Sequence, residues 1–189
     1  MTTFHALALH SDAVRVLTAW APPAEEPQQH ELRALYLEHL DDNLDGVWRS
    51  NREAHITASA LVVDPEEQRV LLTLHAKVGA WLQLGGHCEP DDLSLGAAAL
   101  REATEESGIE GLIISGEPVR LDRHQVYCAG REEPPSWHLD VQYTALAPAG
   151  AREAISEESL DLRWFPWDAL PEQTDDSVRR LVARARATL

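Results

Sequence analysis

The chain has 189 residues, of which 44% are hydrophobic and 25% are charged, a balance typical of a soluble globular protein with one substantial core. Its formal net charge of −16 would repel nucleic acid and anionic membranes, so we expect neither as a partner. No apolar run reaches the length of a membrane span, and the first residues lack the features of a signal peptide, so we expect a cytoplasmic protein. The two cysteines, Cys88 and Cys128, have no paired-ligand spacing, which argues against a disulfide framework or a cysteine zinc site.

The first fifty residues are predicted to be helical. Residues 5–20 carry apolar side chains at helical spacing, APPAEEP then breaks the chain, and residues 28–40 form a second helix. An apolar stripe runs along this second helix and consists of Leu32, Leu35, Tyr36 and Leu40. The stripe must pack either on the rest of the chain or on a second subunit, so a homodimer stays open. We therefore expect residues 1–50 to be an N-terminal helical extension.

From residue 54 onward, apolar and β-branched runs separated by turn residues predict strands. The predicted strands are 54–64, 69–75, 81–84, 112–116, 124–129, 138–147 and 162–165. Residues 96–107 and 175–189 are predicted helices, and residues 166–172 form a turn or short helix. The order of several strands, a helix, several strands and a helix predicts an α/β fold with helices on a mixed sheet.

The helix that contains REATEES crowds three glutamates onto one face. At 100° per residue, Glu106 lies about 40° to one side of Glu102, and Glu105 lies about 60° to the other. Arg101 cannot neutralise three carboxylates. A solvated acidic surface is the ordinary interpretation, but we favour a site for a hard divalent cation, because Mg²⁺ binds carboxylate oxygens and bridges to phosphates. Gly108 suits the left-handed turn that often ends a helix.

The stretch GGHCEPDDLSLGAAALREATEESGI resembles the signature of the Nudix hydrolase family. That signature is a glycine, five residues, a glutamate, seven residues, then Arg-Glu-apolar-x-Glu-Glu-x-Gly-apolar. Its second half matches from Arg101 to Ile109. In the first half, the segment from Gly86 to Arg101 is one residue longer, and the glutamate is replaced by Asp92, or by Asp91 if the GGHCEPDD loop is counted differently. In the family, this carboxylate braces the arginine.

The resemblance covers residues 51–189, which we take as a Nudix hydrolase domain, and implies a Nudix-like α/β/α sandwich with a mixed sheet. It implies an enzyme in which water attacks the pyrophosphate of a nucleoside diphosphate linked to another group, with divalent cations in place. Bound cations would also make a locally positive spot on an acidic protein.

By position, the resemblance implies that Mg²⁺ (or Mn²⁺) binds Glu102, Glu105 and Glu106, with the carbonyl of Gly86 as a further ligand. Arg101 would orient the glutamates through ion pairs.

The general base is left open, because the family varies in this role. One candidate is a glutamate of the helix. Another is Glu158, or its neighbour Glu157, in the segment before Trp164, although an exposed loop is an equally good interpretation of that pair.

Five histidines lie on or beside the predicted strands around the signature: His55, His75, His87, His124 and His138. A buried or surface histidine is the ordinary outcome for each, but as a group they are expected to line a phosphate site or to hold an extra metal. His138 and Asp140 alternate on one strand and so share a face. The expected substrate-binding residues are Lys77, His87, Tyr127 and His138. Trp81, Trp137 and Trp164 could stack on a base, although core packing is commoner.

The substrate class stays open among nucleotide sugars, ADP-ribose, dinucleoside polyphosphates and (d)NTPs. The alternative to an enzyme is a non-catalytic Nudix-like module that senses a nucleotide or binds a partner, and a third hypothesis makes the metal structural. Non-catalytic Nudix-like modules tend to lose the glutamates of the signature helix. Because none is missing here, the enzyme is favoured.

Overall fold

The computed structural model describes residues 3–127, 134–155 and 159–189. Four helices and eight strands are present in these residues. The helices are α1 (Thr3–Ala19), α2 (Pro27–Asp42), α3 (Leu95–Ser107) and α4 (Asp176–Thr188). The strands are β1 (Ala54–Asp64), β2 (Arg69–His75), β3 (Trp81–Leu82), β4 (Leu84–His87), β5 (Ile113–Ile114), β6 (Arg120–Val126), β7 (Ser136–Leu146) and β8 (Ser159–Pro166).

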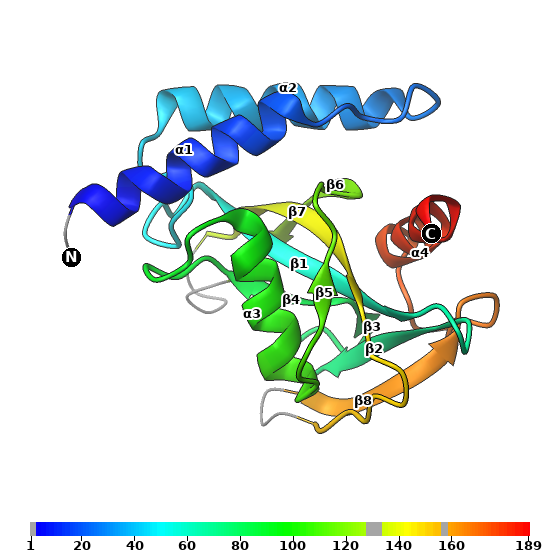
Figure 1. Cartoon of the computed structure of the whole chain (residues 1–189). Coiled ribbons are helices and arrows are strands. Elements are labelled where there is room, and N and C mark those ends of the chain that lie inside the picture. Colours follow the sequence, from blue (N-terminus) through cyan, green and yellow to red (C-terminus); the bar gives the residue numbers. More distant parts are fainter. Residues whose placement is uncertain (1–2, 128–133, 156–158) are drawn as a thin grey trace.

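The strands form one mixed sheet in the order β3-β2-β1-β7-β5, with β4 paired to β1, β6 to β7 and β8 to β2. β1 and β7 run parallel, and the other pairs are antiparallel. Helices cover both faces (Figure 1). Successive residues of β1 point to opposite faces, so Val62 packs in the core that includes α3, while Leu61 and Val63 pack in the core under α4. The α/β prediction of a mixed sheet with packed helices is confirmed.

The stretch before α3 departs from the prediction. Residues 81–84 do not form one strand, and Gly85 and Gly86 belong to β4 rather than to a loop. The reason is steric. Gly85 lies opposite Ser59 of β1, and a Cβ atom on Gly85 would lie 2.3 Å from the Ser59 Cβ. Only a chain without a side chain at this position can pair so closely with β1.

Other boundaries shift by a few residues. β6 begins at Arg120 rather than at residue 124, because Arg120 and Leu121 already pair with β7. Residues 166–172 form turns and no helix. Cys88 is a buried free thiol whose pKa burial raises to about 12, whereas Cys128 lies outside the described residues. Within the described ranges, no helix has both the length and the apolar character needed to cross a bilayer.

The two N-terminal helices pack against the sheet domain. Their buried side chains, among them Tyr36 and Leu40 of the predicted stripe, belong to the same core cluster as α3 and β1. Hydrogen bonds of buried polar groups also fix the orientation of these helices on the sheet domain. The Tyr36 hydroxyl donates to the Asp122 carbonyl at 2.6 Å, and the Leu95 N–H of α3 donates to Asp12 of α1 at 2.9 Å. The stripe thus docks on the chain itself, and a homodimer stays a prediction.

Gln29 of α2 extends the hydrogen bonding of β6. Its amide nitrogen donates to the Leu121 carbonyl at 3.0 Å, and its oxygen accepts from the Leu121 N–H at 2.7 Å, as a neighbouring strand would. Gln29 is buried, so no water can replace it without local opening.

We expect Gln29→Ala to lower the free energy of unfolding by about 2–4 kcal/mol, because it leaves a buried donor and a buried acceptor of Leu121 unpaired. Gln28→Ala, at the exposed neighbouring position, is the matched control and should change stability by less than about 0.5 kcal/mol. Urea unfolding of both variants measures the difference. Equal midpoints for the two variants would show that α2 is not anchored in this way.

Candidate functional site

Both ends of α3 are held by hydrogen bonds. At its start, the Ser94 hydroxyl accepts from the Ala97 N–H at 3.1 Å, as an N-cap residue does. At its end, Gly108 adopts a φ of +65° and its N–H bonds the Thr104 carbonyl, which confirms the predicted left-handed turn. Ala99 and Ala103 are buried against the sheet. The helix is therefore fixed in length and rotation, which determines the face from which its glutamates project.

Arg101 is the centre of an ion-pair network on α3. Its guanidinium donates two hydrogen bonds to the Asp92 carboxylate, both 3.1 Å long. The same group donates to Glu102 and Glu105, each at 3.1 Å, and to the backbone carbonyl of His87 at 3.0 Å. A planar fork with several donors suits such a task. In the structure, Arg101 thus contacts two of the three glutamates, the preceding loop and the end of β4.

Asp92, and not Asp91, occupies the position of the first signature glutamate. Asp92 is buried in its pair with Arg101, while Asp91 is exposed. The Glu89 N–H also donates to Asp92 at 2.7 Å, which ties down the loop. Five residues separate Gly86 from Asp92 and eight separate Asp92 from Arg101, so the extra residue falls after the aspartate.

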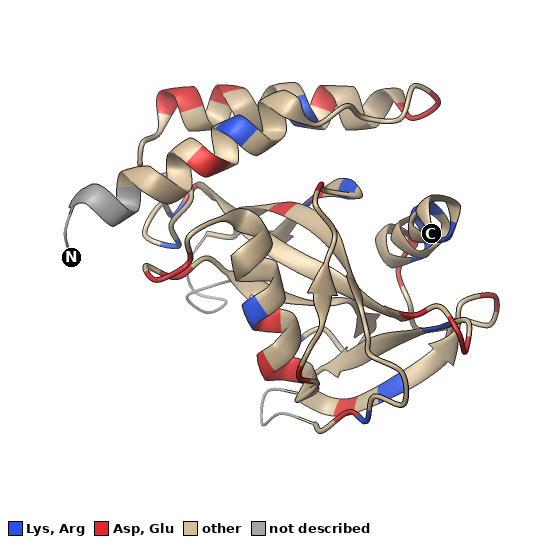
Figure 2. Ribbon diagram, in the orientation of Figure 1, with Lys and Arg blue, Asp and Glu red and all other residues tan. Residues whose placement is uncertain are grey.

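The glutamates differ in their environments. The Glu102 side chain is 16% exposed, that of Glu105 is 61% exposed, and Glu106 is half-buried. Burial raises the pKa of Glu102, Arg101 opposes the rise, and the charge of Glu105 adds to it. Burial works against the charge of Arg101, but the hydrogen bond to Asp92 and the charge of Glu102 raise its pKa above the ordinary value. In Figure 2, the acidic colour gathers on the second half of α3, beside one basic residue.

Gly86 lies directly against Glu102. A Cβ atom on Gly86 would lie 2.6 Å from the nearer carboxylate oxygen of Glu102, so the absent side chain lets the carboxylate approach the strand backbone. The partly buried Glu102 carboxylate, the neighbouring carboxylates and the partly buried Gly86 backbone provide hard oxygen ligands. This donor set fits Mg²⁺ or Mn²⁺.

Histidines gather on the face of the sheet opposite to α3. Three rings meet there, His55 of β1, His87 of β4 and His138 of β7, with ring centroids 4.8–5.1 Å apart. His124 of β6 lies beside them, 5.4 Å from His138, and its Nδ1 is 2.8 Å from an Asp122 oxygen. Strand pairing explains the meeting, because His55 is opposite His138 across the parallel β1–β7 pair.

Burial favours the neutral form of His55, His87 and His138. Burial lowers the pKa of His55, and burial together with the neighbouring histidines lowers that of His87 to about 4 and that of His138 to about 2. For His124 burial works in the same direction, but the hydrogen bond with Asp122 outweighs it and raises the pKa. A neutral imidazole is the form in which histidine binds a metal.

The remaining predicted residues are spread more widely. Lys77 is exposed in the turn after β2, where its N–H donates to the His75 ring at 3.2 Å. His75 is not one of the three histidines whose rings meet. Tyr127 follows β6 and is 56% exposed. Trp81 packs in the core against Phe165, the ordinary outcome. Glu157 and Glu158 lie outside the described residues.

Asp140, which the sequence placed on the same face as His138, is a buried polar group beside the histidines whose hydrogen bonds were not predicted. Asp140 accepts hydrogen bonds from Thr57 at 3.0 Å, from Ser59 at 2.6 Å and from Gln83 at 3.3 Å. Burial raises the pKa of Asp140, and the hydrogen bond from Ser59 works against the rise. The alternation of His55, Thr57 and Ser59 with apolar residues in β1 was the signal that could have revealed this polar face.

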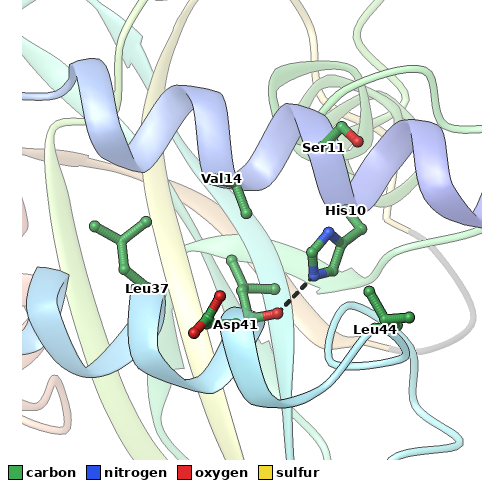
Figure 3. Close-up of a pocket in the computed structure, with 7 residues that line it drawn as sticks. His10, Ser11, Val14, Leu37, Asp41 and Leu44 are labelled. Atoms are coloured by element: carbon green, nitrogen blue, oxygen red, sulfur yellow. Dashed lines mark hydrogen bonds between the residues drawn. The ribbon is translucent and has the colours of Figure 1, made fainter.

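A hollow between α1 and α2 is a separate feature (Figure 3). It is lined by His10, Ser11, Val14, Leu37, Leu40, Asp41 and Leu44. His10 is held by its bond of 2.8 Å to the Leu40 carbonyl. None of the lining residues belongs to the glutamate helix or to the histidine cluster, so we assign the hollow no chemistry.

We expect Asp92→Asn to lower the free energy of unfolding by about 2–4 kcal/mol, because it removes one charge of a mostly buried, two-bond ion pair. Asp91→Asn, at the exposed adjacent position, is the control and should be neutral within about 0.5 kcal/mol. Chemical unfolding of both proteins provides the measurement. If Asp92→Asn unfolds at the midpoint of the control, the pair does not brace α3.

Comparisons with known proteins identify the fold. A family model described as the NUDIX domain matches residues 53–185, which is more than half of the chain. A hydrolase of the NUDIX family from Clostridium perfringens is 25% identical, with a TM-score of 0.56 over 74% of this chain and 99% of that chain. No match was found among curated proteins.

More distant structures show the same fold. The dihydroneopterin triphosphate pyrophosphohydrolase of E. coli is 17% identical, with a TM-score of 0.58 over 71% of this chain and 96% of that one. The Ap4A hydrolase of C. elegans is 18% identical, with a TM-score of 0.52 over 70% and 96%. Together with the signature helix and its braced arginine, the family model and the shared fold show that this chain belongs to the Nudix hydrolase family.

Proposed function

We propose that this protein is a Mg²⁺-dependent (or Mn²⁺-dependent) pyrophosphohydrolase that cleaves a nucleoside diphosphate linked to another group. The observation that carries the proposal is the intact acidic face of α3. Glu102 lies against Gly86, and Arg101, fixed by Asp92, holds Glu102 and Glu105. A solvated acidic helix would not need a buried aspartate to position its arginine.

The cation would be held by Glu102, Glu105 and Glu106, with the Gly86 carbonyl as a further ligand. Bound there, it would neutralise phosphate oxygens and lower the pKa of a bound water. The chain's own contribution is to keep carboxylates in place before substrate arrives. Arg101 does this from the side, as a positioning residue whose donors are directed to protein oxygens.

Substrate contacts are proposed for the predicted set. Lys77 and Tyr127 are exposed at the ends of strands, where a phosphate and a base could reach them. His87 and His138 lie together on the face of the sheet opposite the glutamates, so they would contact a part of the ligand that lies away from the acidic face. For the general base, a helix glutamate and Glu158 both remain candidates. Of these candidates, the helix glutamates lie within the described residues.

The substrate is proposed only as a class. Two of the related structures are named for dihydroneopterin triphosphate and for Ap4A, but at less than 25% identity they support the fold rather than a substrate. We therefore keep nucleotide sugars, ADP-ribose, dinucleoside polyphosphates and (d)NTPs in the candidate set.

A second candidate function is a module that binds a nucleotide without cleaving it. Phosphate or pyrophosphate release across a panel of these four substrate classes, with Mg²⁺ and then with EDTA, separates the two. Turnover that requires the metal supports the enzyme. Tight binding of a panel member without turnover would support the sensing module instead.

We expect Glu105→Gln and Glu106→Gln each to lower turnover about 100-fold, a loss of about 2.7 kcal/mol of transition-state stabilisation, because each removes a charged ligand. Glu110→Gln is the control, since Glu110 is exposed and lies beyond the end of α3. Steady-state kinetics on the substrate found in the panel, with circular dichroism of each variant, provide the test. Wild-type turnover in both variants would refute the assignment of the site.

Gly86→Ala and Gly85→Ala form a second, paired test. The Cβ of Gly86→Ala meets the mobile end of the Glu102 side chain, so the fold should survive while turnover falls about 100-fold through displacement of that carboxylate. The Cβ of Gly85→Ala meets Ser59 of β1, so this variant should lose about 1–3 kcal/mol of stability. Thermal melts and kinetics of both variants should show this separation. Gly86→Ala with normal turnover would contradict the proposed place of Glu102.

A further inference from the structure

The three clustered histidines form a compact donor set away from the glutamates. The potential ligand nitrogens of His55, His87 and His138 all lie within 4.8 Å of one another. A tetrahedral metal with bonds of 2.0–2.1 Å would hold such nitrogens about 3.4 Å apart. Each pair of nitrogens would therefore have to approach by no more than about 1.4 Å for all three to hold one ion.

His55 is oriented as a metal ligand is. Its Nδ1 lies 2.9 Å from the Asn51 carbonyl, which can only accept, so Nδ1 carries the proton and Nε2 keeps its lone pair. His55 is fully buried, and Nε2 has no hydrogen-bond partner among the described residues. A ring whose one nitrogen is fixed by a backbone carbonyl while the other faces a ligand is the usual arrangement at histidine metal sites.

We propose that His55, His87 and His138 bind one transition-metal ion, Zn²⁺ by preference, at a site distinct from the glutamate site. Imidazole nitrogens select borderline metals such as Zn²⁺, whereas the carboxylates of α3 select Mg²⁺ or Mn²⁺. The donor sets are therefore chemically separate. Three protein ligands leave a fourth position for water or for an anionic group of a ligand.

The two sites lie on opposite faces of the sheet, and His87 contributes to both: its ring to the histidine site and its carbonyl to the contact with Arg101. Gly86 faces Glu102 of α3, and because side chains alternate along β4, the His87 ring points to the other face. The His87 carbonyl meanwhile accepts from Arg101. A metal bound to the His87 ring would thus restrain β4, the strand whose His87 carbonyl accepts the hydrogen bond from Arg101. The inference does not depend on the proposed hydrolysis.

The experiment uses the full chain, stripped with EDTA and titrated with Zn²⁺ in excess Mg²⁺, with bound zinc measured by mass spectrometry. We expect one zinc per chain, and Co²⁺ in its place should give the visible spectrum of a tetrahedral site. His138→Ala and His87→Ala should each weaken zinc binding at least about tenfold and abolish the cobalt spectrum. His30→Ala, on the exposed face of α2, is the matched control and should bind as wild type does.

A Glu102→Gln, Glu105→Gln, Glu106→Gln triple variant separates the two sites. It should keep the zinc and the cobalt spectrum. Circular dichroism of the histidine variants checks that loss of zinc is not loss of the fold. The proposal is overturned if wild type holds no zinc in excess Mg²⁺, if folded His138→Ala and His87→Ala bind zinc as His30→Ala does, or if the triple variant loses it.

Discussion

The ion pair between Arg101 and Asp92 is the interaction on which the site depends. It joins a helix, a loop and a strand end, because the same guanidinium also bonds two glutamates and the His87 carbonyl. Three carboxylates on one helical face repel one another, and a fixed arginine within their reach lowers that cost. In this chain the extra residue lies between Asp92 and Arg101, and the aspartate, although shorter than a glutamate, still accepts two hydrogen bonds from the guanidinium.

The two adjacent glycines of β4 show how closely the site is built. Gly85 lets β4 approach β1, and Gly86 lets the Glu102 carboxylate approach β4. The alternation of a strand then directs the next side chain, His87, to the opposite face. Four residues of strand therefore serve both the acidic site under α3 and the histidine cluster.

The N-terminal helices extend the same framework. α1 accepts the first N–H of α3 through Asp12, and α2 bonds the edge of β6 through Gln29. Each contact satisfies a backbone group that would otherwise be unpaired. Helices that lie outside the signature are thereby coupled to the position of the glutamate helix and to β6, the strand that carries His124.

Local patterns in the sequence predicted most of this protein. Periodicity placed β1, β2, β7 and the helices, and the spacing of Glu102, Glu105 and Glu106 predicted their shared face, because a helix determines the angle between its own residues. The choice of Asp92 over Asp91, the inclusion of the glycines in a strand, and the meeting of His55, His87 and His138 depended on the tertiary structure. These features either join residues that are far apart in the chain or depend on which side chain is buried. They follow from which strands pair, in which register and at what distance, and no local period of the sequence encodes those pairings.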